Sequence, residues 1–191
     1  IMEMFLMRES NRINISTARF ANVAFSDGSL LHGFNQRLQK HQPIVAPNDV
    51  LRYFVTPGEA GELCLLSCIY GENRDIFFPK LTEEFKLMGF DEIAIRYLNE
   101  LGYEPYICST EEEARQLAKT GVGLKKWPCY FSASDTTGEK EFEEFYTDSE
   151  IVDWKSFNGI GIVKNGFNFQ EDKLDYFVKK IYELQSMGRW K

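Results

Sequence analysis

Apolar and polar residues alternate along this chain with two different periods, which predict a mixture of helices and strands. Residues 13–20 alternate with a period of two and are rich in β-branched side chains, as is typical of a strand. Thr56-Pro57-Gly58-Glu59 is typical of a helix start, with an N-cap, a proline at the first helical position and a glutamate three residues after the cap. We expect helices at residues 1–9, 30–40, 57–70, 91–100, 110–121 and 172–185, and an acidic helix that follows a polar turn at 135–140 and ends at 145. We expect strands at residues 13–20, 43–46, 50–55, 75–78, 103–108, 127–131 and 157–163.

Helices and strands of this size that alternate along a chain predict an α/β fold. The 191 residues are 43% hydrophobic, which is enough to bury a core and excludes disorder of the whole chain. The net charge of −7 includes no basic block, so we expect no nucleic-acid partner and no anionic-membrane partner. A phosphorylated ligand would therefore have to be bound by a few well-placed cations.

The sequence lacks a membrane-spanning segment and the motifs of metal and dinucleotide sites. No apolar run approaches the ~18–20 residues that span a bilayer, and we expect a cytoplasmic protein with reduced cysteines. Cys64 and Cys68 lie four residues apart in an apolar helical pattern, which predicts two small buried residues, and the spacing of the cysteines predicts no metal site. His32 and His41 are interpreted as surface or structural residues. The dinucleotide fingerprint G-x-G-x-x-G is absent, and the nearest string, at 159–166, has the wrong spacing.

Four short strings occur in a fixed order along the chain, and together they resemble one enzyme family. They are Ala18-Arg19-Phe20-Ala21-Asn22-Val23 with Ser26-Asp27-Gly28-Ser29-Leu30-Leu31, then Leu51-Arg52-Tyr53-Phe54-Val55-Thr56-Pro57-Gly58-Glu59-Ala60, then Phe78-Pro79-Lys80, and finally Gly138-Glu139-Lys140-Glu141-Phe142-Glu143-Glu144. In order and spacing they resemble the UDP-N-acetylglucosamine 4,6-dehydratase group of polysaccharide-biosynthesis proteins, within the extended short-chain dehydrogenases. The branch that makes precursors of nonulosonic, legionaminic-type sugars is the most similar.

This resemblance implies a fold and a division of the chain. The expected fold is the C-terminal portion of a Rossmann-type extended short-chain dehydrogenase, with the last strands of a parallel sheet and a smaller α/β substrate-binding part. Residues 1–27 would end the dinucleotide-binding part, 28–150 would bind substrate with an α/β insertion near 83–126, and 151–191 would form a C-terminal strand and helix. The catalytic Tyr-x-x-x-Lys pair and most of the NAD or NADP site would then lie upstream of Ile1, so this chain would hold no catalytic residue.

The resemblance also implies which residues meet the nucleotide sugar. Arg52 is expected near the diphosphate, since a guanidinium fork meets two phosphate oxygens and keeps its charge. The amide of Asn22 can donate to and accept from a sugar hydroxyl or acyl oxygen. Further expected substrate-binding residues are Ser29 and Leu30 at a helix start, Lys80 and Lys140. Phe20, Ala21 and Val23 are expected to border the nicotinamide.

The alternatives for these residues are local and structural. Arg52 could form an ion pair with Asp49 or Glu59, Asn22 could satisfy a turn, and Ser29 could simply cap its helix. One departure from the family pattern concerns Thr136-Thr137, which stand where the family usually has Arg-Pro. One cation is lost there, so either Lys140 or a neighbour replaces it, or phosphate binding depends more on Arg52.

The function implied is nucleotide-sugar binding within an NAD(P)-dependent 4,6-dehydratase of cell-surface polysaccharide or sialic-acid-like sugar synthesis, homo-oligomeric at full length. The substrate would be a UDP- or GDP-linked N-acetylhexosamine. A nucleotide-sugar epimerase on the same scaffold is one alternative, and a non-catalytic binding or assembly module is another. The isolated chain is expected to be inactive.

Overall fold

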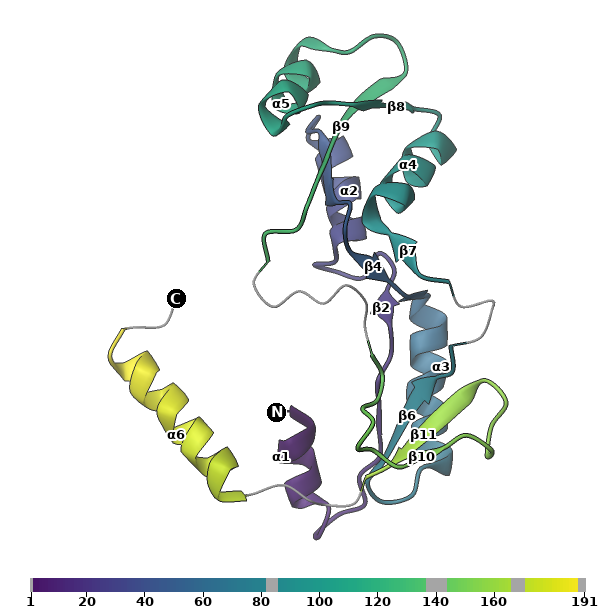
Figure 1. Cartoon of the computed structure of the whole chain (residues 1–191), viewed down its shortest axis with the longest axis vertical. Helices are drawn as coiled ribbons and strands as arrows, with labels where there is room; N and C mark the ends of the chain where they lie inside the picture. The colour runs from purple at the N-terminus through teal and green to yellow at the C-terminus, as the bar shows by residue number, and fades with distance from the viewer. Residues whose placement is uncertain (1, 82–85, 137–143, 166–170, 189–191) are drawn as a thin grey trace. The chain divides into compact units, whose positions relative to one another are not determined.

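The structure, a computed structural model, describes residues 2–81, 86–136, 144–165 and 171–188 (Figure 1). The chain folds as two compact units. Unit 1 contains residues 1–19, 62–80 and 146–191, and unit 2 contains residues 20–61 and 81–145. The three contiguous parts expected from the sequence, 1–27, 28–150 and 151–191, remain a prediction about functional roles.

Unit 1 is built on a four-stranded mixed sheet. Its elements are α1 (Met2–Glu9), β1 (Thr17–Ala18), the end of α3 (Pro57–Tyr70), β6 (Asp75–Pro79), β10 (Val152–Asp153), β11 (Ile160–Lys164) and α6 (Glu171–Ser186). The strand order is β1-β6-β11-β10, with β1 parallel to β6 and the other pairs antiparallel. Phe77 and Phe78 on β6 are at most 1% exposed. Gly161 on β11 lies under the Phe78 ring, where a Cβ would overlap it.

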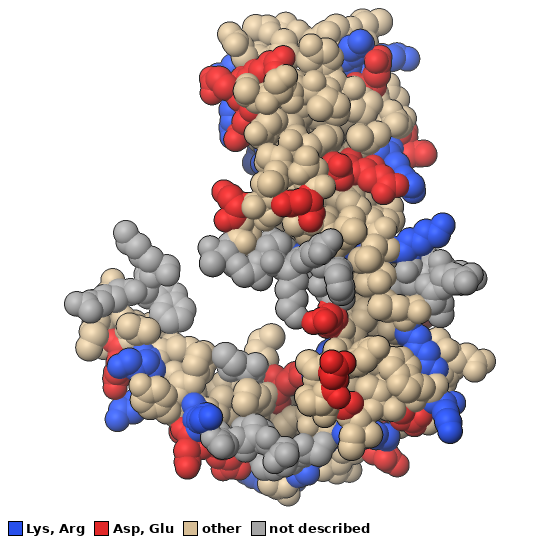
Figure 2. All heavy atoms as spheres, in the orientation of Figure 1, with Lys and Arg blue, Asp and Glu red and all other residues tan. Residues whose placement is uncertain are grey.

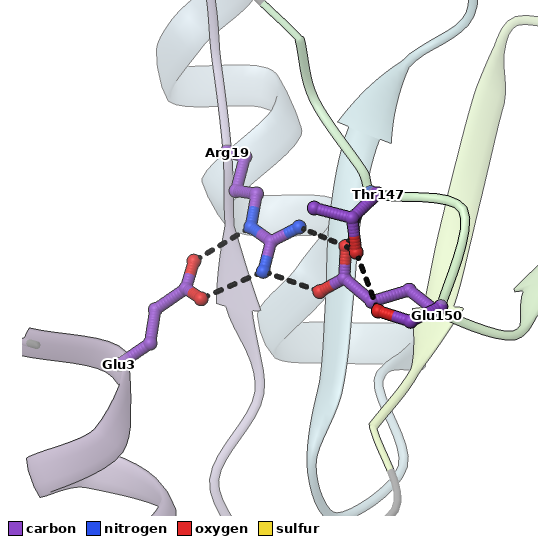
Figure 3. Close-up of polar contacts among 5 residues, drawn as sticks. Glu3, Arg19, Thr147 and Glu150 are labelled. Carbon is purple, nitrogen blue, oxygen red and sulfur yellow. Dashed lines mark hydrogen bonds and ion pairs between the residues drawn. The ribbon is translucent and has the colours of Figure 1, made fainter.

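One arginine joins three segments of unit 1 (Figure 3). Arg19, just after β1, donates Nε and Nη2 to the two carboxylate oxygens of Glu3 on α1, both at 2.7 Å. It also donates to both oxygens of Glu150, at 2.7 and 3.0 Å, and Glu150 accepts a further bond from the Thr147 amide at 2.8 Å. The hydrogen bonds with Glu3 raise the pKa of Arg19, and the guanidinium lowers the pKa of Glu150. The network therefore ties α1 and the 147–150 turn to the sheet.

Unit 2 contains a three-stranded parallel sheet covered by helices. Its elements are β2 (Asn22–Val23), α2 (Leu30–Gln39), β3 (Ile44–Pro47), β4 (Leu51–Arg52), β5 (Phe54–Val55), the start of α3, β7 (Met88–Gly89), α4 (Phe90–Glu100), β8 (Glu104–Ile107), α5 (Glu111–Thr120) and β9 (Lys126–Ser132). β9 lies between β3 and β8 and is parallel to both. β2 pairs with β5 in parallel, and β4 pairs with β7 in antiparallel orientation.

The core of unit 2 forms where α2 and α4 pack on β3. Phe34, Ile44, Ala94, Leu98 and Cys129 are each 0% exposed and belong to one cluster. These residues come from the apolar faces that the helical and strand periodicities predict. The α/β class expected from the sequence is confirmed.

Most expected helices and longer strands are confirmed to within a few residues, and the differences are local. The strand expected at 13–20 is ordered as a strand only at Thr17–Ala18, and the one expected at 50–55 is divided at Tyr53 into β4 and β5. β7 and β10 were not expected, because two residues are too short to show a period of two. The acidic helix expected up to 145 falls largely on residues 137–143, outside the described residues.

The expectation that Cys64 and Cys68 are buried is wrong, because both are exposed. Helix α3 is apolar around much of its circumference, so the sequence pattern does not show which face is covered. The helix buries Leu63 and Ser67, and Cys64 and Cys68 each lie one residue further round. Within the described residues no helix is long and apolar enough to cross a membrane.

The four thiols are predicted to react in two classes. In the folded protein, Cys64 and Cys68 should be labelled by a thiol reagent at mildly alkaline pH, whereas Cys108 and Cys129 should react only after denaturation. Burial raises the pKa of both buried thiols, that of Cys129 to about 12, and the thiolate is the reactive form. Intact-protein mass spectrometry counts the labels. In a Cys64→Ser, Cys68→Ser variant the rapid labelling should disappear, and rapid labelling of that variant would contradict the assignment.

Glu150→Gln is predicted to lower the free energy of unfolding by about 1–3 kcal/mol at pH 7, because it removes the charge of a partly buried, hydrogen-bonded carboxylate. The pKa of Glu150 in the folded protein lies below its ordinary value of 4.5. The carboxylate therefore stabilises the fold fully above pH 4.5 and loses this effect as the pH falls through the lowered pKa. Urea unfolding at several pH values measures the difference.

The matched control is Glu104→Gln, which removes a carboxylate 68% exposed in an ion pair with Lys126. Its effect should be small at every pH, because exposed ion pairs contribute little. A Glu150→Gln effect that stays constant down to pH 3 would contradict the assigned coupling.

Candidate functional site

Unit 2 contains a cavity of about 610 Å³ where several of its elements meet. The volume is within the ordinary range for small-molecule sites. Asn22 and Arg52, two of the residues that the family resemblance assigns to the substrate, both line it. The full lining is Asn22, Leu30, Arg37, Val45, Ala46, Pro47, Arg52, Phe90, Ser132, Ala133, Ser134, Asp135 and Thr136.

The parallel pairing of β3 with β9 positions one wall of this cavity. Pro47 is in register with Ser132, so both strands end at the cavity with their carboxyl ends together. The following turns are also joined, because Asn48 N donates to Ser132 O at 3.0 Å and Ser134 N donates to Asp49 Oδ1 at 2.8 Å. In α/β folds, ligands commonly bind at the carboxyl ends of parallel strands.

Asn22 enters the cavity from β2 and is held by the neighbouring chain segment. Its backbone N–H donates to Tyr53 O at 3.0 Å, and its side-chain Nδ2 lies 3.4 Å from the same oxygen. In this orientation an N–H of the side-chain amide points to Tyr53 O. The amide oxygen can accept a hydrogen bond from a hydroxyl or N–H group.

Arg52 stands on β4 with only 7% of its surface exposed. Its Nη1 donates to Leu51 O at 2.8 Å, and pairing of β4 with β7 fixes the backbone. A guanidinium removed from water interacts more strongly with anionic oxygens than an exposed one does. Of the two ion-pair partners that the sequence allowed for Arg52, Glu59 binds Thr56 at its own helix start and Asp49 accepts a hydrogen bond from Ser134 N.

Ser29 and Leu30 have different positions although they are adjacent. Ser29 Oγ accepts from His32 N at 3.1 Å and is the N-cap of α2. Leu30 lines the cavity, whereas Ser29 does not belong to its lining. The capping alternative for Ser29 is therefore confirmed, and a direct contact of its side chain with substrate remains a prediction.

The two candidate lysines are not among the cavity-lining residues. Lys80 lies in unit 1, where its Nζ donates to the backbone oxygens of Trp154, at 2.5 Å, and Phe157. Lys140 lies outside the described residues. Their binding of substrate stays a prediction.

Of the three residues expected to border the nicotinamide, Phe20 and Ala21 directly precede β2, and Val23 lies on it. Phe20 is 44% exposed, Ala21 is 3% exposed, and Val23 is half-buried. None of them lines the cavity. Their contact with a cofactor stays a prediction, and the described residues contain no group of three or more His, Cys, Asp or Glu side chains suited to a metal ion.

Sequence reasoning missed Arg37 and most of the segment 132–136. Arg37 stands seven residues after Leu30 on α2, and this spacing puts both on one helix face. That spacing was a signal in the sequence, but it does not show whether the face meets a cavity. Thr136, noted for replacing an arginine of the family pattern, also lines this cavity.

A second cavity, of about 450 Å³ in unit 1, contains paired charges instead. Arg19 there is bound by Glu3 and Glu150, and Lys164 Nζ lies 2.9 Å from Asp75 Oδ2. These ion pairs join separate segments of unit 1 and so stabilise its fold.

Figure 2 shows acidic and basic side chains interspersed over the visible face.

The chain is similar in sequence to two curated proteins. The chain is 24% identical over 156 residues to the probable polysaccharide biosynthesis protein EpsC of Bacillus subtilis, covering 80% of this chain and 25% of that protein. It is 24% identical over 160 residues to an uncharacterized membrane protein, MJ1061, of Methanocaldococcus jannaschii, covering 83% and 42%. The chain thus spans less than half the length of these curated relatives.

A solved structure has a similar fold, Pen from Bacillus thuringiensis. It superposes with a TM-score of 0.58 at 16% identity, covering 84% of this chain and 44% of that one. The sequence model of the polysaccharide biosynthesis protein family matches residues 1–165. The chain therefore belongs to the polysaccharide biosynthesis protein family.

Proposed function

We propose that the cavity of unit 2 binds a nucleotide sugar, and that the protein takes part in NAD(P)-dependent 4,6-dehydration of an NDP-linked N-acetylglucosamine. The observation that carries this proposal is the convergence of Arg52 and Asn22 on one cavity of about 610 Å³. Their chemistry complements two different parts of one ligand, an anionic diphosphate and a polar hexose. Membership in a polysaccharide biosynthesis family supports a sugar as the ligand.

Arg52 is assigned to the diphosphate because its buried guanidinium carries a permanent charge and can hold two oxygens at once. The Tyr53 carbonyl orients the amide of Asn22, which is assigned to a sugar hydroxyl or to the acyl oxygen of the N-acetyl group. The apolar side chain of Phe90, which packs edge-on against Phe54 with ring centroids 5.7 Å apart, completes a wall beside these polar groups. These residues would bind and orient the substrate, which is how positioning contributes to rate.

The reaction oxidises the C4 hydroxyl of the hexose, eliminates water across C5–C6 and reduces C6, so that the product is a 4-keto-6-deoxy sugar. Bound NAD(P) would supply the hydride acceptor for the oxidation at C4 and the hydride donor for the reduction at C6. Phe20, Ala21 and Val23 are the residues of this chain assigned to the nicotinamide side. No residue of this chain is assigned to the catalytic tyrosine and lysine of the family.

Arg52→Ala is predicted to weaken binding of UDP-N-acetylglucosamine by about 10-fold to 100-fold, the effect of losing charged hydrogen bonds. Isothermal titration calorimetry measures the Kd, and a thermal melt confirms folding. Arg52→Lys should retain part of the affinity, since it keeps the charge without the fork. The control is Arg115→Ala on α5, where the guanidinium is exposed and paired with Glu111. Unchanged affinity in a folded Arg52→Ala protein would overturn the role of Arg52.

Product analysis of the whole enzyme tests the reaction. With NAD(P)+ and UDP- or GDP-linked N-acetylglucosamine, we expect a product 18 Da lighter, with a C4 carbonyl and a C6 methyl group by NMR. A product of unchanged mass with an inverted carbon would instead identify an epimerase. The purified 191-residue chain should show no turnover, and turnover by it would contradict the assignment of no catalytic residue to this chain.

A further inference from the structure

A second arginine faces the cavity of unit 2. Arg37 lines it together with Arg52 and Asn22. It lies two helical turns beyond Leu30, which also lines the cavity, so α2 follows the cavity for about 10 Å at 1.5 Å per residue. A cavity wall of this length matches an extended ligand better than a single small ion.

The guanidinium of Arg37 is held only loosely. Nη1 donates to Pro43 O at 3.3 Å, which is at the long end for such a bond, and the side chain is half-buried. Across the described residues Arg37 forms no ion pair, whereas Arg96 and Arg115 on other helices are each paired with a glutamate. Asp135 is the acidic residue in the described lining, and it forms no ion pair with Arg37. Arg37 thus brings a positive charge to the cavity wall in a chain that is acidic overall.

We propose that Arg37 is a second cation for the diphosphate, and that it makes the site selective for diphosphates over monophosphates. This inference rests on the proposed function of the cavity. A diphosphate diester carries one negative charge on each phosphate, and Arg52 and Arg37 balance the two. Each guanidinium can donate in parallel to two oxygens of one phosphate, and partial burial strengthens these bonds. Arg37 acts in binding, without a part in the chemical step.

Arg37→Gln is the informative variant, because glutamine keeps a donor for Pro43 O and removes the charge. The probes are UDP-N-acetylglucosamine, UDP and UMP, each titrated into the whole protein by calorimetry. We expect the Kd for both diphosphates to rise about 10-fold, while the Kd for UMP changes less than 3-fold. Arg37→Lys should recover part of the loss. Arg96→Gln, which removes an exposed guanidinium from a helix of unit 2, is the matched control and should leave every Kd unchanged.

The outcomes separate this inference from the function on which it rests. If the wild-type protein binds UDP-N-acetylglucosamine and Arg52→Ala weakens that binding, but Arg37→Gln leaves the ratio of UDP to UMP affinity unchanged, the role of Arg37 is overturned and the site stands. An equal loss for UMP and UDP would also overturn the selectivity. If the wild-type protein binds neither these three nucleotides nor their guanosine counterparts, both the site and the inference fail. A thermal melt shows that each variant is folded.

Discussion

The parallel pairing of β3 with β9 is the constraint on which the proposed ligand site depends. It joins segments some eighty residues apart in the sequence and places the ends of both strands at one edge. The pairing is buried beneath α2 and α4, with Ile44 opposite Cys129 in the core. Because parallel strands need long crossover connections, the register is fixed by packing of the covering helices. A change in that core would therefore move Pro47 and Ser132, and with them one wall of the cavity.

The arginines of this acidic chain lie in two kinds of surroundings. In unit 1 the guanidinium of Arg19 binds two carboxylates and holds segments together. In unit 2, Arg37 and Arg52 line a cavity. The sequence could identify Arg52 and Asn22 because they stand in ordered motifs. It could not identify Arg37. The spacing of Leu30 and Arg37 shows that both lie on one face of a helix, but it does not show whether neighbouring elements cover that face or whether it borders a cavity.

The secondary structure was predictable where a short sequence pattern determines the local hydrogen bonds. The start of α3 is an example: Thr56 N donates to Glu59 Oε2 at 2.7 Å and Glu59 N donates to Thr56 Oγ1 at 3.2 Å, as the capping pattern predicts. The two-residue strands β7 and β10 depend on tertiary contacts that no local pattern contains. The exposure of Cys64 and Cys68 was missed for a related reason, since an apolar helix does not specify which of its faces is covered.

The discontinuity of unit 1 has a consequence for the order in which the chain folds as it leaves the ribosome. Its sheet combines β1 and β6 with β11, so the central hydrogen-bonding partner of β6 is synthesised more than eighty residues later. Unit 2 contains residues 20–61 and 81–145, and its segments have all been synthesised before β11. Contacts between distant segments form slowly because a long loop must close first. During translation, β6 therefore lacks one of its two neighbouring strands for this interval, and its unpaired aromatic edge is then open to wrong association.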